Sequence, residues 1–146
     1  MRRLLTIVTT LIFALPAVAQ KAEIFSQDSF AIRGYDAVAY FTQGKPVKGD
    51  PAHSIQWKNT TWLFSSKENA TAFAKEPSKF APQYGGYCAY GCSEGHKAPT
   101  DPNAWTIVDG KLYLNYNSKV QEIWNRNQSQ RIIQANKNWP TLNDKE

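Results

Sequence analysis

The chain has 146 residues, of which 42% are hydrophobic, and it carries a formal net charge of +5. These values fit one globular domain and exclude a disordered chain or a two-domain enzyme. The lysines are scattered with no run of three, so the sequence lacks the basic footprint of a nucleic-acid-binding protein. Two cysteines are too few for a disulfide-rich scaffold.

The first 19 residues have the pattern of a secretory signal peptide. Arg2 and Arg3 supply the positive start, residues 4–15 form an apolar run, and Ala-Val-Ala at 17–19 is a small-residue cleavage motif. The apolar run is shorter than the ~20 residues that a membrane-spanning helix needs. We therefore expect a soluble mature protein that starts at Gln20, has no membrane span and is periplasmic or secreted.

The rest of the chain divides into an arm, a domain and a tail. Residues 20–33 are mixed and poorly periodic, so we expect an N-terminal arm that docks at its end. The domain is expected over residues 34–140. Pro140 is expected to close the last helix and leave residues 141–146 as a C-terminal tail.

Two β-hairpins are predicted from alternating apolar residues on either side of a turn. The first covers residues 54–64 around a Lys58-Asn59 turn. The second covers residues 105–114 around Asp109-Gly110, a strong type I′ turn signal. That turn sets a register with the expected pairs Val108–Lys111, Ile107–Leu112, Thr106–Tyr113 and Trp105–Leu114.

Helices are predicted from capping boxes and from apolar residues at helical spacing. Ser65 with Glu68 begins one helix, and Ser118 with Gln121 begins another. The glycine-rich segment 78–95 predicts turns with short helical pieces. We therefore expect a small single α+β domain in which the two β-hairpins form an antiparallel sheet packed against three or more short helices.

Chemistry-bearing residues concentrate at Cys88, Cys92 and His96, which are spaced by four and four. On a helical backbone this spacing places both sulfurs on one face. Thiolate and imidazole ligands suit Cu(I) and Zn(II), so the motif is a candidate metal site, with copper as the first choice and zinc as the second. A structural zinc site needs four ligands, and His53 is the candidate for the fourth.

The residues alone leave three alternatives open for this motif. An exported chain with two cysteines commonly forms one disulfide, which would make the domain a non-catalytic binding module. The same thiols suit a metal ion. They also suit redox chemistry in which Cys88 attacks and Cys92 resolves, while His96 lowers the pKa of a thiol. The sequence has no G-x-S-x-G motif, phosphate-binding loop or paired carboxylates, so we expect a binding protein rather than an enzyme.

Three stretches resemble one family. They are residues 34–41 (GYDAVAYF), residues 57–66 (WKNTTWLFSS) with Phe73, Pro77 and Phe80, and residues 85–89 (GGYCA) with Asp101-Pro102 and Asn115-Tyr116-Asn117. The first two resemble the YHS domain, and the third is similar to an exported subgroup of YHS-domain proteins that includes selenoproteins. The resemblance extends over about residues 30–140.

The resemblance implies a compact α+β module that handles heavy metals, often copper. Metal-type members have cysteines where this chain has Ala39, Ser65 and Asn69. Cys88 stands at the position that resembles the selenocysteine of the exported subgroup. The resemblance therefore implies that Cys88 is a reactive thiol or a soft-metal ligand. With the clustered ligand types, it leads us to expect an exported soft-metal (copper) binding, buffering or sensing protein. Its expected partners are a metal ion and another periplasmic protein.

Overall fold

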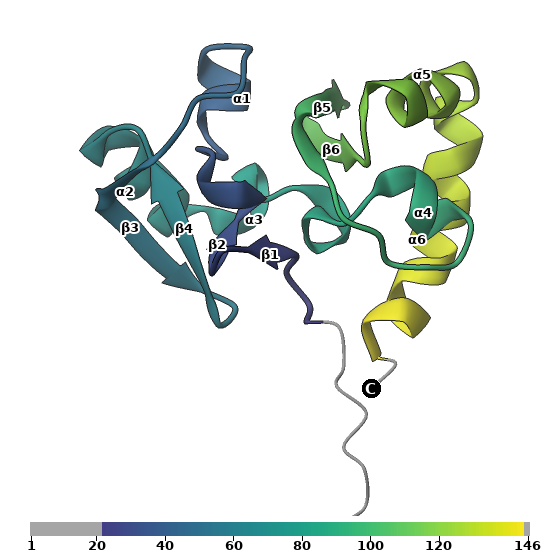
Figure 1. Ribbon diagram of the computed structural model, residues 1–146, viewed down its shortest axis with the longest axis horizontal. Coiled ribbons are helices and arrows are strands. Elements are labelled where there is room, and N and C mark those ends of the chain that lie inside the picture. Colours follow the sequence, from purple (N-terminus) through teal and green to yellow (C-terminus); the bar gives the residue numbers. More distant parts are fainter. Residues whose placement is uncertain (1–21, 145–146) are drawn as a thin grey trace, which may run out of the picture.

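In a computed structural model, residues 22–144 are described, and the expected signal peptide and Gln20 lie outside them. Figure 1 shows how the described elements are arranged. In chain order they are β1 (Ser26–Gln27), β2 (Phe30–Ala31), the 3-10 turn η1 (Ile32–Gly34), α1 (Ala39–Thr42), β3 (Asp50–Trp57), β4 (Thr60–Phe64), α2 (Lys67–Lys75), α3 (Pro77–Phe80), η2 (Gln83–Gly86), α4 (Ala89–Ser93), β5 (Asp101–Val108), β6 (Lys111–Asn115), α5 (Ser118–Arg126) and α6 (Gln128–Asp144).

The strands form two sheets, and the predicted α+β class is confirmed. One sheet is mixed and has the order β1-β2-β4-β3, with β2 parallel to β4. The other contains only β5 and β6. The two predicted hairpins therefore lie in separate sheets and do not share one antiparallel sheet. The physical reason is that β2, from the N-terminal arm, occupies the edge of β4 that the second hairpin would need.

Both hairpins form where the sequence predicts them. In the second, the four expected pairs from Trp105–Leu114 to Val108–Lys111 are all present. Its turn residues Asp109 and Gly110 have φ of 51° and 72°, as a type I′ turn requires. In the first, Lys58 and Asn59 also adopt positive φ, at 49° and 57°. Local turn chemistry therefore determines the register of both hairpins.

Three helix ends differ from the prediction. The cap of α5 is Asn117 and not Ser118, since Asn117 Oδ1 accepts from Val120 N–H at 2.9 Å. The cap of α2 is Ser66, whose Oγ accepts from Asn69 N–H at 3.1 Å, because the Ser65 hydroxyl donates to Asp36 instead. The prediction that Pro140 closes the last helix is wrong, since α6 continues to Asp144. Trp139 and Leu142 pack against the same hydrophobic cluster on either side of this proline. Partial burial of both side chains offsets the loss of the hydrogen bond that proline cannot donate.

The β5–β6 hairpin separates two hydrophobic clusters. Leu112 and Leu114 belong to the larger cluster with β4 and α2. Tyr113, between them in sequence, belongs to the smaller cluster with α4, α5 and α6. Figure 1 shows β3, β4 and α2 on one side of the molecule and α4, α5 and α6 on the other. Because alternate strand residues face opposite ways, this hairpin is packed on both faces and joins the two halves.

The N-terminal arm is docked from the first described residue. The carbonyl of Ala22 accepts from the Tyr87 hydroxyl at 2.6 Å and from Lys97 Nζ at 3.2 Å. Phe25 N–H donates to Gly85 O at 2.8 Å. A Cβ at Gly85 would lie 1.8 Å from Glu23 O, so this close approach requires glycine. Within residues 22–144, no helix has the length and apolar character needed to cross a membrane.

Asp36 is the most highly bonded buried carboxylate in the described chain. Its side chain is fully buried, and Oδ1 accepts from the backbone N–H groups of Val38 and Ala39 at 2.8 and 3.2 Å. Oδ2 accepts from Ser65 N–H, Ser65 Oγ and Asn69 Nδ2 at 2.7–2.8 Å. Five donors therefore surround one buried charge and tie the start of α1 to the β4–α2 connection.

We expect Asp36→Asn to lower the free energy of unfolding by about 3 kcal/mol, because an amide nitrogen replaces one acceptor and faces buried donors. Urea denaturation measures this loss. Asp50→Asn is the matched control, since Asp50 Oδ1 accepts from Ala52 N–H at 2.8 Å on the exposed surface. It should cost less than about 1 kcal/mol. Equal losses in the two variants would contradict the role given to Asp36.

Candidate functional site

Cys88 lies between η2 and α4, with its thiol buried at 2% exposure. Its backbone N–H donates to Ala98 O at 3.0 Å, and its Sγ accepts from Gly91 N–H at 3.4 Å. The thiol in turn donates to Asn115 Oδ1 at 3.6 Å. The same oxygen accepts from Tyr90 N–H at 3.0 Å. Cys88 is thus the cap of α4 and is held in place from β6.

Cys92 lies one helical turn after Cys88, fully buried in the smaller hydrophobic cluster. Its N–H donates to Cys88 O at 2.9 Å, so the turn between the two residues is helical. Both cysteines are free thiols. Side chains four apart on a helix have Cβ atoms about 5–6 Å apart, whereas a disulfide needs roughly 3.5–4.5 Å. Cys88 itself has non-helical φ and ψ of −56° and 117°, so one thiol lies at the cap of α4 and the other within the helix.

Burial controls the protonation of both thiols. It raises the pKa of Cys88, although backbone N–H groups of Gly91, Tyr116 and Tyr90 act against that rise. Burial also raises the pKa of Cys92 to about 12, with a further rise from the nearby Cys88 and a smaller opposing effect of Lys97. Both groups are therefore protonated at neutral pH, and Cys88 has the stronger hydrogen-bond support for a thiolate.

The two histidines lie at different distances from the cysteines. His96 is exposed and folds back over α4, with its Nε2 3.3 Å from where a Cβ at Gly91 would lie. His53 is on β3, and Figure 1 shows β3 on the opposite side of the molecule from α4. The structure thus brings Cys88 and Cys92 together, with His96 close by, and does not bring His53 to them. In residues 22–144, no three His, Cys, Asp or Glu side chains are grouped to hold a metal ion.

Asn115 is a site residue that the sequence analysis missed. It is fully buried at the end of β6, and its Oδ1 serves both Cys88 and Tyr90. Its Nδ2 has no hydrogen-bond partner among the described residues. The available signal was a polar residue that directly follows the apolar strand residues 112–114. Such a residue is buried only when its side chain has specific partners, and here one partner is the Cys88 thiol.

Comparison with known proteins gives no match. No family model matches the chain, and no curated protein and no solved structure matches it either. The resemblance to the YHS domain therefore stays a prediction from sequence.

We expect the free energy of unfolding to fall as pH rises from about 9 to 12, because the raised pKa of Cys92 belongs to the folded state only. The unfolded thiol ionises near pH 8.5, so this group favours unfolding by up to about 1.4 kcal/mol per pH unit between the two values. Urea denaturation across this range should show a shallower decline for Cys92→Ala. Parallel curves for the two proteins would contradict the buried, protonated thiol.

Proposed function

We propose that the chain is an exported protein that binds a soft metal ion, Cu(I) before Zn(II), through the Cys88 and Cys92 thiolates. One observation carries the proposal: two buried free thiols lie about one turn apart, Cys88 at the cap of α4 and Cys92 within it. This arrangement presents two sulfurs to one ion. It does not favour a disulfide between them, which would require the turn to distort.

The donor set favours copper over zinc. Thiolates are soft ligands that select Cu(I), whereas a structural zinc site uses four ligands. The described residues hold no group of three metal-binding side chains, so a site built on the two sulfurs suits the ion that demands fewer ligands. The ion is the cargo of the protein, which would buffer, carry or sense copper rather than catalyse a reaction.

The surroundings of Cys88 suit a site that becomes negatively charged. Two thiolates carry two negative charges, and one Cu(I) leaves a net charge of −1. The N–H groups of Gly91, Tyr90 and Tyr116 stabilise that charge at the Cys88 sulfur. These backbone donors therefore offset part of the free-energy cost of burying the charge.

The YHS resemblance and export belong to the same proposal. Ser65 and Asn69, two of the positions where metal-type YHS members have cysteine, both donate to Asp36. The third, Ala39, donates its backbone N–H to the same carboxylate. All three positions thus contact one carboxylate and lie close together, which supports the resemblance. With the signal-peptide pattern, it supports a periplasmic or secreted YHS-type protein that exchanges its ion with another exported protein.

A thiol redox role is the second candidate, and the asymmetry of the two thiols favours it. Backbone N–H donors favour the thiolate of Cys88, whereas burial raises the pKa of Cys92 to about 12. Cys88 would attack a disulfide of a partner protein, and Cys92 would displace the second partner thiol. The partner disulfide is then reduced to two thiols, and the Cys88–Cys92 pair is oxidised to a disulfide. This reaction requires the helical turn to unwind, so it ranks second.

Native mass spectrometry of the exported protein, purified without chelator or reductant and loaded with one equivalent of Cu(I), tests the proposal. We expect one bound copper in the wild type, and none in Cys88→Ser or Cys92→Ser. His53→Ala is the matched control and should bind like the wild type, since β3 is remote from α4. Retained stoichiometric copper in Cys88→Ser would refute the site. A copper-free mass lowered by two hydrogens would favour the redox alternative.

The pH dependence of copper affinity is a separate test. Both thiols have a raised pKa, so both are protonated below about pH 8.5 and each must release its proton to bind the ion. We expect the logarithm of the affinity to rise by about two for each pH unit between pH 6 and 8. Competition with a chromophoric Cu(I) chelator, corrected for its own protonation, measures the slope. A slope near zero would exclude binding through these two thiols.

A further inference from the structure

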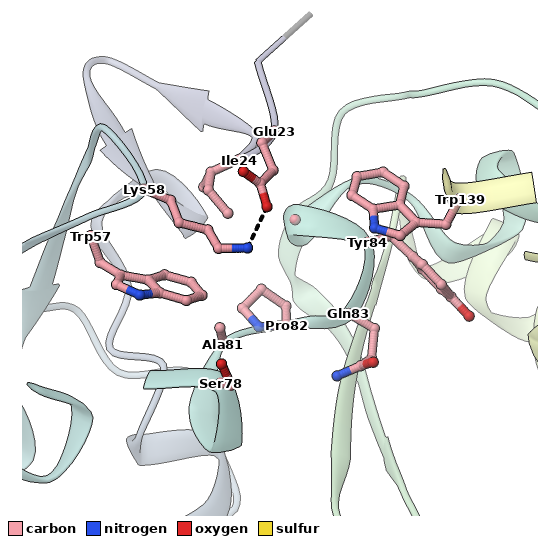
Figure 2. A pocket seen from close by; sticks show the side chains of 11 residues that line it. Glu23, Ile24, Trp57, Lys58, Ser78, Ala81, Pro82, Gln83, Tyr84 and Trp139 are labelled. Atoms are coloured by element: carbon pink, nitrogen blue, oxygen red, sulfur yellow. Dashed lines mark hydrogen bonds and ion pairs between the residues drawn. The ribbon is translucent and has the colours of Figure 1, made fainter. Parts of the chain in front are cut away.

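A cleft of about 230 Å³ lies between the β3–β4 hairpin and α6. Figure 2 shows Trp57 and Trp139 on opposite sides of it, with Lys58 and Glu23 between them and Ala81 and Pro82 below. Four separate segments of the chain contribute to its walls. Neither cysteine is among the residues that line it.

The charges of the cleft are a matched pair. Among the described residues that line the cleft, Lys58 and Glu23 are the only charged side chains, and they form an ion pair. Each side chain is 41% exposed. The pair joins Nζ to Oε1, so it uses one of three ammonium donors and one of two carboxylate oxygens. The remaining donors and the second oxygen are the polar groups that the pair offers to a ligand.

We propose that this cleft binds a small zwitterion, namely a free α-amino acid with an apolar side chain. Its carboxylate would accept from the Lys58 ammonium, and its ammonium group would donate to Glu23. Ligand and protein charges would then alternate around a closed ring of four groups. Each charge has an opposite charge as its neighbour, which is the complementarity that gives charged sites their specificity.

The same pair disfavours ligands that carry one charge. An anion bound to Lys58 would lie next to the Glu23 carboxylate, and a cation bound to Glu23 would lie next to the Lys58 ammonium. Like charges at such distances repel by about as much as opposite charges attract. A zwitterion avoids both contacts, because its two ends match the two ends of the ion pair.

The other walls fit the apolar part of such a ligand. Trp57 is fixed by edge contacts to Trp62 and Phe73, with ring centroids 5.6 and 5.7 Å apart. Trp139 packs on Tyr84 at 5.9 Å. These contacts preorganise the two indoles, so little entropy is lost on binding. The cleft volume lies below the ~300–1,000 Å³ of typical drug-sized sites, which favours a ligand as small as one amino acid.

The close approach at Gly85 helps to position the charged pair. Glu23 O lies against Gly85, and the next residues are held by the bond from Phe25 N–H to Gly85 O at 2.8 Å. The backbone that carries the carboxylate is therefore fixed to the cleft wall. Lys58 is positioned in turn by the tight β3–β4 turn, and its Nζ lies 4.9 Å from the Trp57 ring centre. Both charges are presented by defined backbone segments.

Isothermal titration calorimetry of the mature protein with L-leucine and L-phenylalanine tests the proposal. N-acetyl-L-leucine retains only the negative charge, and L-leucine methyl ester retains only the positive charge. We expect saturable binding of at least one free amino acid and about 10-fold weaker binding of both analogues of leucine. Absence of saturable binding by both amino acids, or equal affinity for leucine and its analogues, would overturn the proposal.

Variants locate the binding in the cleft. Glu23→Gln and Lys58→Met should each weaken amino-acid binding about 10-fold, because each removes one charge of the ring. The matched control is the ion pair between Glu76, the cap of α3, and Lys79 on that helix, which is 3.5 Å apart, more exposed and outside the cleft lining. Glu76→Gln and Lys79→Met should bind as the wild type does. Wild-type affinity in both cleft variants, with circular dichroism confirming their fold, would overturn the assignment.

Discussion

The fold depends on one buried carboxylate. Asp36 is surrounded by five donors that come from α1, the end of β4 and α2. A buried charge is tolerated only when its hydrogen bonds are satisfied, so these segments must meet in one arrangement. The network also explains a local detail: because Ser65 is committed to Asp36, the helix cap passes to Ser66. The position of the hairpin and helix against α1 follows from these bonds.

A second constraint is the hairpin that is packed on both faces. Leu112 and Leu114 point into one cluster while Tyr113 points into the other, so β6 cannot shift by one residue without exchanging the two cores. The end of this strand supplies Asn115 to the Cys88 thiol. The register set by Asp109-Gly110 extends to the Trp105–Leu114 pair, and a bulge on β5 precedes the Asp101–Asn115 pair, so Asn115 is placed by the bulge as well as by the turn.

Structural features that depend on neighbouring residues are predicted from the sequence, whereas features that depend on contacts between distant segments are not. Asp109-Gly110 determines its own turn, and the register follows from it. The separation of the hairpins depends on β2 pairing with β4, which is a contact between distant segments and leaves no local signal. Pro140 is a helix breaker by local rules, but burial of Trp139 and Leu142 overrides it. The four-residue spacing of Cys88 and Cys92 does not by itself decide that Cys88 is the non-helical cap of α4, and the location of His53 on β3 likewise depends on the fold.

Helix α6 holds the thiol pair and the cleft in a fixed relation. Asn138 donates through Nδ2 to the carbonyls of Cys92 and Ser93, at 2.9 and 3.1 Å, and so completes the last turn of α4. The next residue, Trp139, is a wall of the cleft. Two neighbouring residues therefore serve two sites with different chemistry. Because both thiols are buried, the copper binding that we propose would require local opening of the structure around α4.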